Sequence, residues 1–505
     1  MADVKTTDGK SAGVTYTSVD VTYFEQRALK RHARVWSLWA LGVGAVISGH
    51  FSGWNLGIAS GGWGGMFIAA VIIAIMYLGL TFSIAEMSPA LPHTGAAYSF
   101  ARTTMGPWGG FVTGLCENVE YVITPAVVVS FIGSYMGSIF GTPPEFQPVY
   151  WIFGYIIFVG LNVVGVELSF RVTLVVTLAA LACLVAFWVS ALPVADFSRW
   201  ALNIGVGPDG TAVELPNGGG PFLPFGLAGA FGALPFAVWL FLAIEQLPLA
   251  AEESVDPKTD MPKGIMAGMA TLIVSAFMIL WLNSSVANGA FGLSTSLEPL
   301  LDGFKAIYGT GLAKLLAGVA VIGLIASFHT IIYAQGRQIY SLSRAGYFPR
   351  GLSITHGGRK TPHVAMIAGA VVGLLIMLVI WFALGADAGA AAIGGTLLNM
   401  AVFGAMLSYV MQALSFILMR KNMAHIERPY KSPFGVPGAV ATIVIALVTI
   451  YYQLSDPIYR SGVIGVAIWF AVGIAYFAAF GRHKLVLSPE EEFALSKGTS
   501  EYKSY

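Results

Sequence analysis

Residues 36–59 read WSLWALGVGAVISGHFSGWNLGIA, an apolar run that is long enough to cross a membrane but carries glycines and polar side chains. Five of its residues are glycine, and each costs a helix about 1 kcal/mol relative to alanine. A bilayer tolerates irregular backbone only where protein or a water-filled cavity surrounds it. The stretch therefore predicts a membrane helix that either packs closely against a neighbour or unwinds at a site.

Both interpretations of the glycines stay open. Gly49, Gly53 and Gly57 recur every four residues, which fits a close-packing face of small residues. Polar side chains lie among these glycines and favour an unwound segment instead. They are Ser48, His50 and Ser52.

The composition indicates that most of the chain lies in a membrane. The 505 residues are 56% apolar and only 10% charged, whereas an average soluble domain is about 25% charged. A soluble protein could not cover its surface with so little charge. The two cysteines, Cys116 and Cys183, lie inside apolar runs, which argues against a disulfide framework or a CxxC metal site.

A bilayer core needs about 20 apolar residues as helix, and the sequence contains twelve such runs. We therefore expect an all-α polytopic membrane protein with a permease domain at 36–480 and tails at 1–35 and 481–505. The expected spans are 36–60, 64–88, 107–140, 149–166, 171–192, 225–250, 264–287, 311–341, 363–384, 393–419, 438–455 and 461–480.

The distribution of basic residues predicts the orientation. With twelve spans, 23 of the 27 lysines and arginines fall on the side that carries both termini. Loops rich in these residues stay in the cytoplasm. We therefore expect both tails to be cytoplasmic.

The sixth expected span is also interrupted. Pro235 and Pro248 bracket its second half, and Glu245 lies there among apolar residues. A purely structural role for Glu245, neutral or paired with a loop arginine, is the alternative to a functional one. Interrupted spans at matching places in two halves indicate a transporter site built from inverted repeats. The halves would be 36–192 and 225–419, with two extra helices at 438–480.

Two carboxylates lie deep in the third expected span. Glu117, Glu120, Tyr121 and Thr124 follow a spacing that places them on one helical face. Facing a polar cavity, the carboxylates would attract a cation or carry a proton. A tertiary pair with a buried base is the alternative, but no lysine or arginine lies inside the core of any expected span.

The eighth expected span offers candidates for coupling transport to an ion. Ser327, His329 and Thr330 are adjacent polar residues in an apolar run. A lone histidine of this kind is more often a satisfied helix contact than a proton relay. A coupling proton and a coupling sodium ion both stay open.

Motifs for other functions are absent from the sequence. It has no GxSxG elbow, HExxH helix or Walker lysine loop and no basic patch for nucleic acid. We expect no enzyme activity, no cofactor and no metal site. Without a nucleotide-binding domain, an ion gradient or exchange must drive transport. The oligomeric state stays open.

Several loops resemble those of amino acid–polyamine–organocation (APC) permeases. They are AEMSPALPHTGAAYSFARTTMGPWGGF (85–111), LAAEESVDPKTDMPKGI (249–265), GRQIYSLSRAGYFP (336–349) and RPYKSPFGVPG (428–438). The resemblance covers about residues 20–480. It implies a five-plus-five inverted-repeat (LeuT-like) core with broken helices 1 and 6 that works by alternating access.

Within that superfamily the sequence is most similar to bacterial ethanolamine permeases. The stretches that carry this similarity are SGHFSGWNLG (48–57), GGWGGM (61–66), ENVEYVITPAVV (117–128) and AIEQLPLAAEE (243–253). The resemblance implies ethanolamine import across a bacterial inner membrane. A permease or exchanger for amino acids or other small amines is the alternative.

The resemblance also assigns site residues by position. The first break of the family reads I-G-[ST]-G-I-F, and here His50 replaces a glycine beside Ser48 and Gly49. This change alters the amide cradle for an amino acid carboxylate, which ethanolamine lacks. Glu120 with Glu117 would bind the ammonium, and His50 or Ser48 the hydroxyl. The other matched positions are Val46 and Leu242 for backbone carbonyls, Tyr121 on the acidic face, Trp239 as a cation–π cover, and Glu245 as organiser of the break or proton carrier.

Overall fold

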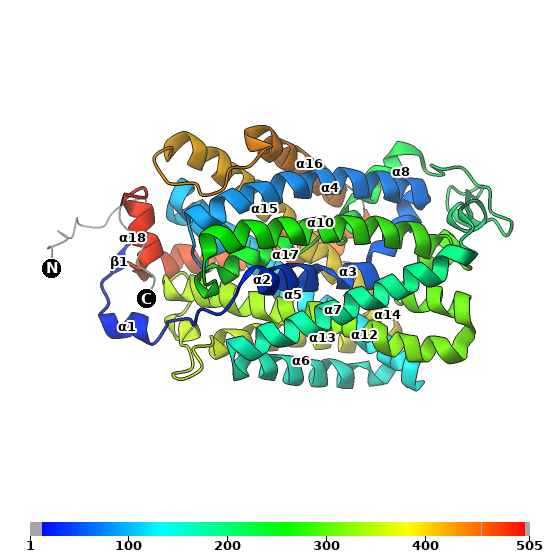
Figure 1. Ribbon diagram of the computed structural model, residues 1–505, viewed down its shortest axis with the longest axis horizontal. Helices are drawn as coiled ribbons and strands as arrows, with labels where there is room; N and C mark the ends of the chain where they lie inside the picture. The colour runs from blue at the N-terminus through cyan, green and yellow to red at the C-terminus, as the bar shows by residue number, and fades with distance from the viewer. Residues whose placement is uncertain (1–12, 456, 500–505) are drawn as a thin grey trace.

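The computed structural model describes residues 13–455 and 457–499, and nearly all of its regular structure is α-helix. In the described residues, ten helices are long and apolar enough to cross a membrane. They lie roughly side by side in an elongated bundle (Figure 1). The ten are α4 (Ile58–Ala90), α5 (Ala96–Phe140), α6 (Gln147–Val164), α7 (Val166–Ala191), α10 (Pro257–Ser284), α12 (Pro299–Arg344), α13 (His363–Leu384), α15 (Leu398–Asn422), α16 (Gly435–Ser455) and α17 (Arg460–Ala479).

These ten helices coincide with the expected spans two to five and seven to twelve. Three of those that begin before the expected span carry a glycine with positive φ inside them: Gly62 in α4, Gly106 in α5 and Gly309 in α12. Glycine adopts this conformation without steric cost, so the chain kinks there. The expected apolar runs at 64, 107 and 311 begin within two residues of these kinks, and the segments before them are separate helical arms.

The segments expected as spans one and six contain only short helices. The first holds α2 (Val35–Val46), α3 (Ser48–Phe51) and the 3₁₀ turn η1 (Trp54–Gly57). The sixth holds α8 (Gly226–Gly232), α9 (Leu234–Val238) and the 3₁₀ segment η5 (Ile244–Glu253). Both segments are therefore interrupted within the bundle.

The remaining elements are short and lie mostly in connections. The helical ones are α1 (Val21–Glu25), η2 (Pro144–Phe146), η3 (Leu192–Val194), η4 (Phe197–Ala201), α11 (Gly289–Leu293), η6 (Arg350–Ser353), α14 (Ala386–Ala392), η7 (Ile393–Leu397), η8 (Pro457–Tyr459), η9 (Gly481–His483) and α18 (Pro489–Leu495). Strands β2 (Ile204–Val206) and β3 (Ala212–Glu214) pair antiparallel, and β1 (Tyr16–Thr17) pairs parallel with β4 (Leu485–Val486).

The core lies around α5, which packs against α12 and α15. Helices α6, α7, α13, α16 and α17 carry large apolar side chains that stay exposed, as expected for a surface that faces lipid. Examples are Ile156, Val175, Phe382, Val444 and Val472.

The described parts of both expected tails fold onto one end of the bundle. β1 and α18 lie together there, at the left of Figure 1. The β1–β4 pair joins the tail segments directly. Residues 1–12 and 500–505 of the expected tails lie outside the described residues.

Candidate functional site

The first interruption centres on Ser52 and Gly53. Helix α2 continues through Ile47 into α3 with helical dihedrals, and Ser52 is then fully extended. Gly53 has φ 95°, which only glycine adopts readily. Of the two interpretations of the glycines, unwinding fits Gly53, whereas Gly42 and Gly44 stay helical. A Cβ at Gly42 would lie 2.8 Å from Leu247, so this glycine serves close packing.

The second interruption is the turn between α9 and η5. Ala243 adopts φ 84° and ψ 4° there, a left-handed conformation that is costly for alanine. Oε2 of Glu245 accepts a hydrogen bond of 3.1 Å from the amide of Ala243. The carboxylate of Glu245 therefore accepts a hydrogen bond from an amide that lies outside the helical hydrogen-bond pattern. Leu242 lies in the same turn, and Val46 is the last residue of α2.

His50 joins the two interruptions. Its Nε2 lies 2.9 Å from the carbonyl oxygen of Leu240, and its Nδ1 lies 2.9 Å from Oγ of Ser275 on α10. A carbonyl can only accept, so Nε2 carries the proton and Nδ1 accepts from the serine. Both ring nitrogens thus have protein partners. The sequence suggested that His50 binds a substrate hydroxyl. To do so, its ring must give up the hydrogen bond to Leu240 or the one to Ser275.

Trp239, in the second interrupted segment, also contacts the first interruption. Its indole Nε1 donates a 3.0 Å hydrogen bond to the carbonyl of Ser52. A Cβ added to Gly49 would lie 2.1 Å from the carbonyl oxygen of Trp239. Gly49 is therefore required by a close approach of two backbones.

Three carboxyl groups are buried beside the second interruption. Glu117 and Glu120 of α5 and Glu245 of η5 are each at most 1% exposed. Glu120 interacts electrostatically with both of the others. Both oxygens of Glu120 lack a well-formed hydrogen bond, as do Oε2 of Glu117 and Oε1 of Glu245. We call these three residues the acidic cluster.

Tyrosines surround the acidic cluster. The hydroxyl of Tyr121 points to Oε1 of Glu117 at 3.5 Å. Tyr77 of α4 and Tyr409 of α15 have hydroxyl oxygens 2.9 Å apart, and both interact electrostatically with Glu245 and Glu120. The sequence did not single out Tyr77 or Tyr409, because each is one aromatic residue in an apolar run. Only the packing of α4 and α15 brings them here.

Among the described residues, no basic side chain neutralises the acidic cluster. In the part of the chain that the structure describes, none of its members forms an ion pair with lysine, arginine or histidine. An ionised carboxylate that is buried without a partner is very costly. The carboxyl groups must therefore hold protons or receive a cation, and the arrangement suits a small cationic ligand or a proton.

Comparison with known proteins identifies the family. Residues 38–484 match the model of the family described as amino acid permease. The chain belongs to this family. It is a multi-pass membrane permease for small molecules, as its apolar helices also indicate.

Characterised and uncharacterised relatives span most of the permease. An uncharacterized transporter of Rhizobium meliloti is 26% identical, over 83% of this chain and 85% of its own length. The methylthioribose transporter of Bacillus subtilis is 24% identical, over 92% and 96% respectively. The branched-chain amino acid permease of the same species is 24% identical, over 90% and 94%.

The coupling candidates of the permease point in different directions. Ser327 donates to the carbonyl of Ala45 and accepts a 2.8 Å hydrogen bond from Ser48, so it contacts the end of α2. Thr330 bonds to carbonyls of its own helix. His329 faces α6 and α7, where Asn162 and Ser169 lie 3.0 and 3.3 Å from its ring nitrogens. Only Ser327 is tied to the first interruption by a hydrogen bond.

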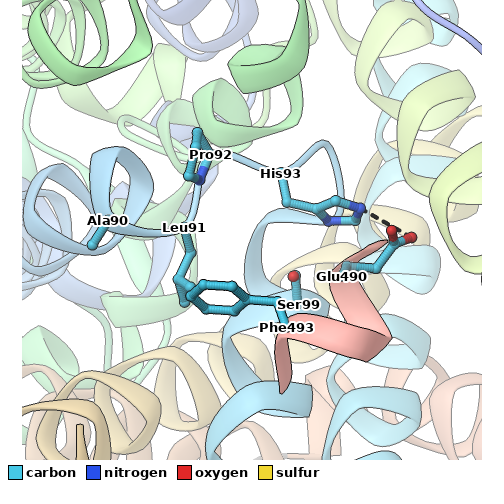
Figure 2. A pocket seen from close by; sticks show the side chains of 7 residues that line it. All are labelled: Ala90, Leu91, Pro92, His93, Ser99, Glu490 and Phe493. Carbon is cyan, nitrogen blue, oxygen red and sulfur yellow. Dashed lines mark ion pairs between the residues drawn. The ribbon is translucent and has the colours of Figure 1, made fainter. Parts of the chain in front are cut away.

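A second group of charges, which the sequence did not indicate, closes the end that carries the tails. Figure 2 shows Glu490 of α18 against His93, which lies between α4 and α5, with 3.0 Å between Oε1 and Nε2. Arg344 pairs with Glu252 at 2.6 Å and with Glu490 at 3.4 Å, and Arg102 pairs with Glu491 at 2.5 Å. We call these six residues the terminal cluster.

The terminal cluster is electrostatically well matched. Burial alone would raise the pKa of the Glu490 carboxyl, but Arg344 and then His93 outweigh burial and hold this pKa well below its usual range. The pKa of Glu252 is lowered in the same way, by Arg344 and His93 against burial. Both carboxylates are therefore ionised and fix the tail to the ends of the helices.

Proposed function

We propose that the permease imports a small primary amine, with ethanolamine as the first candidate, by alternating access. The observation that carries this proposal is the acidic cluster, three buried carboxyl groups that no base pairs with in the described part of the chain. An ammonium group supplies the missing charge and up to three hydrogen-bond donors. A neutral solute would leave the carboxyl groups as they are.

The binding mode follows from the positions of the side chains. Glu120, with Glu117, takes the ammonium, and the tyrosine hydroxyls complete its hydrogen bonds. Backbone carbonyls near Val46 and Leu242 supply further acceptors at the two interruptions. Trp239 covers the cation by a cation–π contact worth about 0.5–2 kcal/mol.

In this binding mode, the hydroxyl of the substrate binds at the first interruption. Ser48 is the candidate with a free acceptor, since its own proton goes to Ser327. Glu245 holds the amide of Ala243 and is the group best placed to carry a coupling proton. A sodium ion near Ser327 is the alternative coupling device.

We propose the membrane arrangement on the same basis. Ten helices plus the two interrupted segments make twelve spans, as a five-plus-five inverted-repeat core with two extra helices requires. The terminal cluster then closes the cytoplasmic end of the permease in a bacterial inner membrane, with both termini in the cytoplasm. The excess of lysine and arginine on that side supports this orientation.

An amino acid substrate is the second candidate, because the matching family is described as amino acid permease and several relatives are named for amino acid transport. An amino acid carries a carboxylate, which the acidic cluster would repel. It also needs free amides at the first interruption, where the amides of His50, Ser52 and Gly53 already donate hydrogen bonds within the chain. These features favour an amine without a carboxylate.

Uptake into proteoliposomes tests the proposal. Radiolabelled ethanolamine is supplied under imposed pH and sodium gradients, in competition with choline, amino acids and diamines. We expect Glu120→Gln to lose uptake, whereas Glu145→Gln, a change at an exposed carboxylate of η2, retains it. Wild-type uptake by the Glu120→Gln protein would refute the assignment.

Thermal unfolding separates a binding role of Glu120 from a structural one. Breaking a buried ion pair costs about 3–5 kcal/mol, but Glu120 has no such pair to break. Its neutral isostere should therefore melt at or above the wild-type temperature. Uptake of a radiolabelled amino acid that unlabelled ethanolamine does not inhibit would favour the second candidate.

A further inference from the structure

A groove on the lipid-facing side of the bundle runs between α6 and α13. It has a volume of about 360 Å³, within the range of small-molecule sites. Its walls are apolar and a Cβ at Gly160 would meet nothing within 4 Å, so the groove is open at that point. The lining side chains are mostly aliphatic and include Ile156, Val159, Val163, Ile367 and Val371.

A basic pocket adjoins this groove at the end of α6, and its lining takes in the N-terminal tail at Lys30. The groove is lined as far as Val163, and the pocket begins at the next residue, Val164. The pocket has a volume of about 340 Å³. Its charged lining residues are Lys30, Arg171, Arg359 and Glu167, which leaves an excess of positive charge.

The charges of the basic pocket are available to a ligand. Arg171 pairs with Glu167 at 2.5 Å, but both side chains are largely exposed. An exposed pair of this kind contributes at most about 1 kcal/mol, so the guanidinium can turn to a phosphate, which it binds with two parallel hydrogen bonds. The pocket also contains the first residues of α7, whose amide groups favour an anion.

The walls of the basic pocket are fixed by contacts between distant segments. Thr361 donates a 3.0 Å hydrogen bond to the carbonyl of Val163, which joins the loop before α13 to the end of α6. The amide of His32, two residues after Lys30, donates to the carbonyl of Glu253 at 2.7 Å. The pocket is therefore held open by structure that exists without a ligand.

We propose that the pocket and groove together bind one anionic phospholipid. The phosphate lies among Lys30, Arg171 and Arg359, and an acyl chain lies between α6 and α13. A free phosphate would use the pocket but not the adjoining apolar groove. A zwitterionic lipid would use the groove but bring its own positive charge toward three basic side chains.

The lipid would support a helix of the permease site. Tyr155 lines the groove, and its ring packs against Phe328 with ring centroids 5.0 Å apart. Phe328 lies between Ser327 and His329 on α12. An acyl chain in the groove would therefore contact Tyr155, which packs against α12, the helix that contacts the first interruption.

Native mass spectrometry of the full chain in detergent tests the proposal without reference to any transported substrate. Phosphatidylglycerol and phosphatidylcholine are added in separate arms, and inorganic phosphate is added as a competitor in a third. We expect one phosphatidylglycerol to be retained in preference to phosphatidylcholine. Inorganic phosphate should not displace it, because the acyl chain contributes to binding.

Variants separate the pocket from the groove. The double change Arg171→Gln and Arg359→Gln should weaken phosphatidylglycerol retention about 30-fold, and Lys263→Gln with Lys421→Gln, at exposed positions elsewhere, should not. Gly160→Phe should weaken retention of the lipid by filling the groove. Equal retention of both lipids, displacement by phosphate, or wild-type retention in the arginine double variant would overturn the proposal.

Discussion

Replacing Gly49 by alanine should prevent the two interruptions from closing on each other. The added Cβ would lie 2.1 Å from the carbonyl oxygen and 3.1 Å from the carbonyl carbon of Trp239. Both are backbone atoms, so no side-chain rotation relieves the clash. Overpacking of this kind costs about 1–3 kcal/mol, and 3 kcal/mol lowers the population of the closed arrangement roughly hundredfold. We therefore expect uptake to fall by about that factor.

The assay is initial-rate uptake in proteoliposomes containing equal amounts of folded protein, with thermal unfolding measured in parallel. Gly318→Ala is the matched control, because this glycine of α12 has nothing within 4 Å of the added Cβ. That change should leave uptake unaltered and raise the melting temperature slightly, since alanine favours a helix. If Gly49→Ala transported at the wild-type rate, the close approach of Gly49 and Trp239 would not be needed for transport.

Three further predictions concern stability and pH. Arg337→Met should lower the free energy of unfolding by about 3–5 kcal/mol, because it leaves the buried Glu253 without its 2.9 Å partner; denaturant unfolding measures this. Tyr409→Phe should cost about 1–3 kcal/mol by leaving the Tyr77 hydroxyl buried and unpaired, visible as a lower melting temperature. The pKa of Glu490 is below its ordinary value of 4.5 in the fold, so its stabilising effect is complete above that pH and is lost as pH falls below it. The protection of the α18 amides against hydrogen exchange, measured relative to the intrinsic exchange rate at each pH, should therefore fall on acidification, and Glu490→Gln should weaken this dependence.

Much of the fold could be predicted because each helix that crosses a bilayer needs about 20 apolar residues. Ten apolar runs became ten long helices, and the run boundaries at 64, 107 and 311 fell beside the kinks at Gly62, Gly106 and Gly309. The helical arms before Gly106 and Gly309 were not predicted, because their mixed polarity has no membrane signal. The first residues of α4, before Gly62, had been assigned to the end of the expected span 36–60.

The candidate site could be predicted only in part. The spacing of Glu117 and Glu120 places them on one face of any helix, so their proximity follows from the sequence. The partners Tyr77, Tyr409 and Ser275 come from other helices, and no local pattern reveals which helices will meet. The terminal cluster was missed for a related reason, since a charged tail normally indicates solvent, and Glu490 is buried only because Arg344 and His93 compensate its charge.

The pairing of β1 with β4 has a consequence for biosynthesis. Thr17 donates to the carbonyl of Leu485, a contact between residues 468 positions apart. Contacts of such long separation form late, after the intervening helices have left the ribosome and entered the membrane. Until residue 485 is made, that end of the bundle cannot close, and the groups that α18 covers stay accessible. A chain that ends before residue 485 would therefore leave these groups exposed, and proteases that degrade unfinished proteins would have access to them.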